Sequence, residues 1–183
     1  DPAKSLFTVL PVPYDSTTTY KSGAREGPRA LIEASRQMED FDIELGFEPS
    51  AYGIHTLPEL EPHAGGPEAM IQRVSRVVTQ IANRDQFLVT IGGEHSISVG
   101  VVEALHRLYP DLSVLFLDAH ADMRLEYQGT KYSHACTGRR INEICKTILV
   151  GTRSMSSEER EFIQERALPS FSPTQAFMDG ISP

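Results

Sequence analysis

Two carboxylates and an imidazole follow an apolar run in the segment LFLDAHADMR, residues 115–124. These side chains, Asp118, His120 and Asp122, are two positions apart and are separated only by alanines. Alternate side chains of an extended chain point to the same side, so we expect the three to converge. Burying two carboxylates is costly unless a cation neutralises them, which favours a divalent metal site. Oxygen and imidazole donors without a thiolate suit Mn²⁺, with Zn²⁺ and Fe²⁺ as alternatives.

A second imidazole is found in the segment TIGGEHS, residues 90–96. Gly92 and Gly93 permit a tight strand-to-helix turn that presents His95 where a helix begins. Two other interpretations are a glycine turn with a surface Glu-His pair and a phosphate loop, but neither G-x-G-x-x-G nor G-K-[ST] is present. Taken alone, the D-x-H-x-D motif is equally compatible with a strand end carrying solvated acids. Together, however, the two motifs supply four ligands from two strands, which favours a metal site.

The elements that must position these ligands alternate between strand and helix patterns. We expect strands at 6–12, 51–57, 86–93, 112–120 and 146–152, with a sixth near 168–173. The spacing predicts helices at 27–39, 67–84, 96–108, 135–145 and 156–168, the last with a Ser156–Glu159 capping box. The strand at 112–120 is apolar on both faces and is therefore expected inside a covered sheet. This alternation predicts an α/β fold with a parallel sheet, whose ligands bind beyond the carboxyl ends of the strands.

Composition and charge limit the classes of partner. The 183 residues have room for one domain with a substantial core, so we treat 1–183 as a single domain. The net charge of -8 disfavours nucleic acid and an anionic membrane surface as partners. The sequence shows no membrane span and no signal-peptide pattern. Cys136 and Cys145, expected roughly 13 Å apart along a helix, are too distant to bridge, so we expect a reduced, cytoplasmic protein.

The segments GGEHS and DAHAD resemble two signature motifs of the ureohydrolase family, which includes arginases, agmatinases and formimidoylglutamases. The stretches PVPYDSTTTYKSGAREGPRALIEAS and DMRLEYQGTKYSHAC resemble the agmatinase branch, and the match runs from about residue 10 to about residue 155. The resemblance implies the arginase-like fold, a three-layer α/β/α arrangement around a parallel sheet. It also implies a homo-oligomer, a trimer or a hexamer.

The resemblance further implies two Mn²⁺ ions that share a bridging hydroxide. His95 and Asp122 would serve one ion and His120 the other, with Asp118 bridging both. His134, in YSHAC, matches the family histidine that passes a proton to the leaving amine or to bulk water; without the family pattern it is a histidine at a helix start. The implied reaction hydrolyses a small cationic guanidino substrate, most simply agmatine to putrescine and urea. Guanidinobutyrase, arginase and formimidoylglutamase activities are the alternatives.

The third metal motif of the family, S-x-D-x-D-x-x-D-P, has no match, because the segment FMDGISP contains Asp179 alone. The family's sheet has eight strands with its last two in the middle, whereas this sequence predicts five or six. We therefore interpret the chain as an N-terminal portion of the family domain, truncated before that motif, with bare central strand edges. We expect at most one tightly bound ion and little or no turnover. A non-catalytic metal-binding or assembly homologue is the alternative.

Overall fold

The computed structural model describes residues 4–178 and confirms the α/β alternation, including the sixth strand. The strands are β1 (Phe7–Val12), β2 (Ile54–Thr56), β3 (Phe87–Gly92), β4 (Ser113–Leu117), β5 (Lys146–Val150) and β6 (Ser170–Phe171). The α-helices are α1 (Gly27–Ser35), α2 (Pro67–Ile81), α3 (Ile97–Leu108), α4 (Thr137–Asn142), α5 (Ser157–Glu165) and α6 (Pro173–Met178). Short 3-10 helices lie at Ala24–Glu26, Pro49–Tyr52 and His134–Cys136.

The strands form two parallel sheets, in the orders β2-β1-β3 and β4-β5-β6. The longest pairing joins β1 to β3 from Phe7↔Phe87 to Val12↔Gly92, and β4 pairs with β5 from Ser113↔Lys146. Within residues 4–178, β3 and β4 do not pair with each other, and a cavity of about 640 Å³ lined by both strands lies between them. The expected bare central edges are therefore those of β3 and β4.

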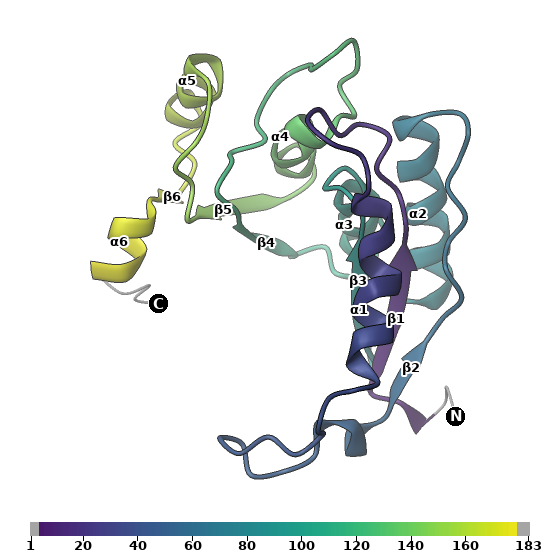
Figure 1. Cartoon of the computed structure of the whole chain (residues 1–183). Helices are drawn as coiled ribbons and strands as arrows, with labels where there is room; N and C mark the ends of the chain where they lie inside the picture. The colour runs from purple at the N-terminus through teal and green to yellow at the C-terminus, as the bar shows by residue number, and fades with distance from the viewer. Residues whose placement is uncertain (1–3, 179–183) are drawn as a thin grey trace.

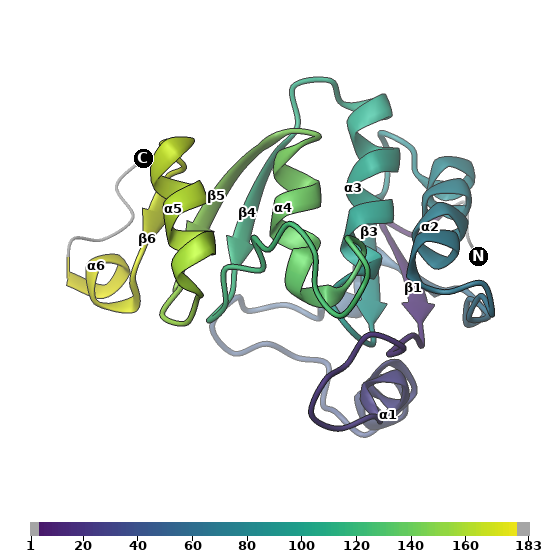
Figure 2. The same ribbon diagram turned by 90° about the horizontal axis from the view of Figure 1, so that it is seen from above.

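Helices cover the first sheet on both faces, as the three-layer prediction requires. Figures 1 and 2 show α1 on one side of β1 and β3, and α2 and α3 on the other. One face of α2 is apolar, and its buried residues Met70, Val74 and Val78 pack with β1 and α3 in one hydrophobic cluster. The buried members of that cluster are Leu10, Val12, Tyr14, Met70, Val74, Val78, Ile97 and Ala104.

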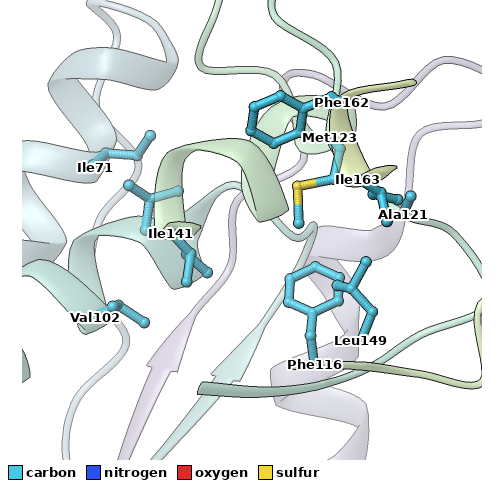
Figure 3. Close-up of a cluster of buried hydrophobic side chains, with 10 residues drawn as sticks. Ile71, Val102, Phe116, Ala121, Met123, Ile141, Leu149, Phe162 and Ile163 are labelled. Carbon is cyan, nitrogen blue, oxygen red and sulfur yellow. The ribbon is translucent and has the colours of Figure 1, made fainter. Parts of the chain in front are cut away.

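A second hydrophobic cluster joins the two sheets through their helices (Figure 3). From the helices, the cluster contains Ile71 of α2, Val102 of α3 and Ile141 of α4. From the second sheet, it contains Phe116 of β4 and Leu149 of β5. Val99, Ala121, Met123, Phe162 and Ile163 complete it. Because β3 and β4 are unpaired, this helical layer carries the contact that sets the position of one sheet relative to the other.

The expectation that the strand at 112–120 is covered on both faces is wrong. The strand is shorter, Ser113–Leu117, and Phe116 is buried while Leu115 is 54% and Leu117 is 70% exposed. The buried face packs in the helical layer, but no helix within residues 4–178 covers the opposite face. An apolar pattern on both faces indicates that each face could pack against other apolar side chains. Within the described residues, only the face with Phe116 does so.

Four helix predictions differ from the structure in length, and those at 67–84 and 156–168 each end three residues early, at Ile81 and Glu165. The helix that begins at Gly27 ends at Ser35 instead of residue 39, and the stretch 135–145 divides into a 3-10 turn, the short α4 and a loop. Cys136 and Cys145 therefore do not share one helix, but both are free thiols, as predicted. None of the helices described is both long enough and apolar enough to cross a membrane.

Candidate metal centre

Three of the predicted ligands converge where the two sheets face each other. His95 Nδ1 lies 2.9 Å from Asp122 Oδ2 and 3.3 Å from Asp118 Oδ2. One donor atom from each of the three residues lies within 4.8 Å of the other two. His95 follows β3, whereas Asp118 and Asp122 follow β4, so the group draws on the carboxyl ends of one strand from each sheet.

The turn that presents His95 depends on a close backbone approach. A Cβ atom on Gly93 would lie 1.9 Å from the carbonyl oxygen of Tyr14, so only glycine fits there. The Glu94 amide donates to the same oxygen at 2.7 Å. The Glu94 carboxylate accepts from both the amide and the hydroxyl of Ser96 at 2.8 Å, which fixes the start of α3. The His95 ring stacks on buried Phe116 with centroids 4.7 Å apart.

The Asp118–Asp122 segment does not continue β4 as a regular strand, so the expected extended alternation is wrong. The strand β4 ends at Leu117, Asp118 Oδ1 accepts the His120 amide at 2.8 Å, and Asp122 has a φ of 50°. The carbonyl oxygen of Asp122 accepts from the amide of Arg139 in α4 at 3.1 Å. The two carboxylates still meet His95, but from an irregular segment rather than from one face of a regular strand.

Helix α4 supports this segment at close range. A Cβ atom on Gly138 would lie 2.6 Å from the carbonyl oxygen of Ala121, so the glycine lets the helix backbone pack directly on the ligand segment. Ala121 is fully buried beneath it. The small spacer residue noted in the sequence thus has a packing role on the side away from the ligands.

His120 lies beside the three-donor group rather than in it. Its side chain is 66% exposed, and its Nδ1 lies 3.4 Å from Asp118 Oδ1, the oxygen that also accepts the His120 amide. A parallel backbone bridge pairs His120 with Ser154. The structure therefore brings His120 to the same carboxylate but leaves its ring turned toward solvent.

The charge distribution of the group follows from these contacts. Burial alone would lower the pKa of His95, but hydrogen bonds and charge interactions with Asp118 and Asp122 raise it to about 9. The hydrogen bond from His95 lowers the pKa of Asp118 to about 2. Both shifts favour a protonated imidazole beside two ionised carboxylates at neutral pH.

All four predicted ligands and His134 line one cavity of about 720 Å³. Its other walls include Arg124, Tyr127 and Glu159, together with the segment 18–21. His134 Nδ1 lies 3.2 Å from the hydroxyl of Thr17 and 3.3 Å from that of Ser133, and its ring meets Tyr127 edge-on at 6.1 Å. The histidine matched to proton transfer thus shares a cavity with the acidic group.

The sequence pattern of the arginase family matches residues 5–183. The chain belongs to the arginase family. It is 37% identical to N(1)-aminopropylagmatine ureohydrolase from Synechocystis sp., covering 92% of this chain and 58% of that protein. It is 29% identical to agmatinase from Bacillus subtilis, covering 86% of this chain and 55% of that protein. The chain thus spans a little over half the length of these relatives.

Solved structures of the arginase family share this fold. The agmatine ureohydrolase of Thermoplasma volcanium superposes with a TM-score of 0.88 at 30% identity, covering 99% of this chain and 61% of that one. The formimidoylglutamase of Bacillus subtilis superposes equally well, with a TM-score of 0.88 at 20% identity, over 96% of this chain and 57% of that one. Because the superpositions span nearly the whole chain, they include both sheets, and the predicted incomplete arginase-like fold is confirmed.

Two residues at the cavity, Glu159 as part of its wall and Thr17 as a partner of His134, were not identified from the sequence. The predicted capping box is present, with Ser156 N–H donating to Glu159 Oε2 at 2.7 Å. Glu159 is also only 4% exposed, lines the cavity, and accepts the Met123 amide at 2.9 Å, which ties α5 to the ligand segment. Thr17 was the other omission. The Ser156–Glu159 cap could be predicted from a local sequence pattern. The contacts of Glu159 with Met123 and of Thr17 with His134 join residues far apart in the sequence.

Proposed function

We propose that the protein containing this chain hydrolyses a guanidino amine, agmatine to putrescine and urea, in a reaction that depends on Mn²⁺. The observation that carries the proposal is the meeting of His95, Asp118 and Asp122 in the cavity that His134 also lines. Membership of the arginase family and the names of the relatives support the same reaction class.

The donor set fits a divalent ion of the Mn²⁺ type. Two carboxylates and an imidazole, with donor atoms within 4.8 Å of one another, are hard and borderline ligands, and no thiolate is among them. His95, Asp118 and Asp122 would hold the ion, and His120 is placed to join through its contact with Asp118. A divalent ion bound there supplies an acidified water as nucleophile and electrophilic assistance to the guanidinium carbon.

The remaining chemistry falls to the chain's own side chains. His134 stands in the cavity wall and is available to pass a proton to the amine that leaves as putrescine. Glu94, Tyr127 and Glu159 also line the cavity and offer oxygen acceptors that a cationic guanidinium can contact. These roles require neither nucleic acid nor a membrane surface.

A second substrate, N(1)-aminopropylagmatine, is favoured by a specific observation. Four relatives named for its hydrolysis are 33–37% identical to this chain, whereas the Bacillus subtilis agmatinase is 29% identical. Both substrates carry the same reacting guanidinium and differ in the amine tail. Arginase, guanidinobutyrase and formimidoylglutamase activities require a tail carboxylate to be bound, so they are the less favoured alternatives.

We also propose a cytoplasmic homo-oligomer, a trimer or a hexamer. Two free cysteines support a reducing compartment. The open strand edges and the exposed face of β4, with Leu115 and Leu117, support self-association because such surfaces are costly to leave in water.

Urea release tests the proposal on the complete product of the gene and on residues 1–183. We expect Mn²⁺-dependent urea release from agmatine or N(1)-aminopropylagmatine by the complete product, and little or none from arginine. Residues 1–183 alone are expected to bind at most one ion tightly and to turn over little substrate. Metal binding by the complete product without urea release from any guanidino compound would instead support a non-catalytic homologue.

A further inference from the structure

His134 is held by two hydroxyl groups on the same ring nitrogen. Thr17 Oγ1 lies 3.2 Å from Nδ1 and Ser133 Oγ lies 3.3 Å from it. Thr17 belongs to the loop after β1, 117 residues before His134, and it also accepts the His134 backbone amide at 2.9 Å. Both hydroxyl-bearing residues are buried, with exposed fractions of 9% and 2%.

The loop that carries Thr17 is itself anchored. The fully buried carboxylate of Asp15 accepts the Gly23 amide at 2.7 Å and the Arg25 guanidinium Nε at 2.6 Å. The Asp15 carbonyl oxygen accepts the Thr18 hydroxyl at 2.9 Å. Asp15 and Thr18, on either side of Thr17, are both held by hydrogen bonds. The Thr17 hydroxyl is therefore held in place beside the His134 ring.

Counting donors and acceptors assigns the proton on the His134 ring. Within residues 4–178, neither hydroxyl has an acceptor other than Nδ1. A proton on Nδ1 would therefore leave both hydroxyl protons without an acceptor in a buried place, which is costly. A bare Nδ1 accepts from a hydroxyl, and the Thr17 oxygen is then free to accept the backbone amide.

We propose that Thr17 and Ser133 hold His134 in the neutral tautomer that carries its proton on Nε2. Nε2, the nitrogen with no hydrogen-bond partner within the described residues, is then the one that exchanges protons with the cavity. Thr17 and Ser133 act as positioning residues, because they act through His134. The tautomer assignment stands on hydrogen bonding alone, and only its consequence for turnover rests on the proposed function.

The direct test is the ring nitrogen spectrum of His134 in ¹⁵N-histidine-labelled protein, recorded at alkaline pH and assigned with a His134→Asn variant. We expect an unprotonated Nδ1 and a protonated Nε2 in the wild type. Replacing both hydroxyls, in Thr17→Val with Ser133→Ala, should move the two signals toward the mixture of tautomers seen for free imidazole. Thr17→Ser keeps a hydroxyl and should keep the wild-type spectrum even if Thr17→Val folds poorly.

Thr147→Val is the matched control, because Thr147 is a buried threonine of β5 whose hydroxyl bonds the Cys145 carbonyl outside this cavity. It should leave the His134 signals unchanged. A wild-type spectrum with the proton on Nδ1, or an unaltered spectrum in the double variant, would overturn the inference whatever the urea assay shows. In active protein, the double variant should lower kcat by about 10-fold or more with little change in KM, since general acid–base steps contribute about 100-fold or more.

Discussion

His95 Nδ1 and Asp122 Oδ2 approach to 2.9 Å across the boundary between two sheets that share no strand pairing. One residue follows β3 and the other follows β4, and the helical layer below holds those strands in place. The candidate metal centre therefore depends on helix packing as much as on the sheets. Predictions about metal binding and about the stability of this core are consequently linked.

The two motif histidines are expected to contribute unequally to metal affinity. His95→Asn removes a donor from the three-residue group, so Mn²⁺ affinity should fall by at least about 10-fold. That is the smallest loss typical of mutating a residue that only hydrogen-bonds a metal ligand, and His95 is itself a proposed ligand. His120→Asn should weaken the first ion by less, because the His120 ring lies outside that group and is largely exposed. Isothermal titration calorimetry measures both, with His55→Asn in β2 as a remote control. Equal losses in the two variants would contradict this geometry.

Mn²⁺ binding is expected to release a proton at neutral pH. The pKa of His95 without metal is raised to about 9, so the ion must displace a proton that is bound below that pH. Apparent affinity should therefore rise with pH from 7 toward 9 and level off above it. Calorimetry at pH 7 in two buffers of different ionisation enthalpy counts the protons released. No proton release at that pH would show that His95 is neutral in the metal-free protein.

The buried carboxylate of Asp15 should stabilise the fold in a pH-dependent way. Hydrogen bonds from Arg25 lower its pKa from 3.8 to about 2, so its contribution is complete above about pH 4 and is lost as the pH falls toward 2. Asp15→Asn should lower the free energy of unfolding at pH 7 by about 2 kcal/mol through lost hydrogen bonds to a charged acceptor. Urea denaturation at pH 7 and pH 3 should show a smaller difference at the lower pH.

Asp111→Asn, at an exposed position before β4, is the charge-matched control for Asp15 and should leave stability within about 0.5 kcal/mol. Because the Arg25 side chain is 51% exposed, solvent screens its charge, and Arg25→Gln should cost less than Asp15→Asn. The reverse order would indicate that the ion pair, rather than the backbone contacts of the loop, is the main contribution.

The exposed face of β4 is expected to drive self-association. Leu117 is 70% exposed, and Leu117→Lys places a charge on that face without touching the buried side of the strand. Sedimentation should show a smaller fraction of oligomer in the variant at equal concentration. A lysine at exposed Leu31 of α1 tests whether any added charge has this effect. An equal decrease of the oligomer fraction in both variants would show that the exposed face of β4 does not form the interface.

Much of the secondary structure could be predicted because it depends on residues close together in the sequence. The helix that begins at Pro67 and the Ser156–Glu159 capping box are indicated by residues close together in the sequence, and both are present. Three of the four predicted ligand residues, His95, Asp118 and Asp122, lie close together, whereas His120 lies beside them and segment 118–122 is not a regular extended strand. The sequence DAHAD does not indicate that β4 ends at Leu117, nor that Asp122 takes a φ of 50° and contacts α4.

The contacts that could not be predicted are long-range. Nothing near Thr17 indicates that its hydroxyl meets His134, because the two residues are brought together only when β1 and the 3-10 turn after Ser133 take their places. Glu159 was visible as a cap but not as the acceptor of the Met123 amide. The exposure of Leu117 could not be predicted either, because the apolar pattern of a strand does not indicate which of its faces packs against other residues.

The central claim is that His95, Asp118 and Asp122 form a divalent-cation site at the facing ends of β3 and β4. Equilibrium dialysis of residues 1–183 against Mn²⁺, followed by metal analysis, tests it most directly. We predict one tightly bound ion per chain, and none when Asp118→Asn and Asp122→Asn are combined in a chain that keeps its wild-type circular dichroism. No bound ion in the wild type, or an ion retained by the double variant, would contradict the claim.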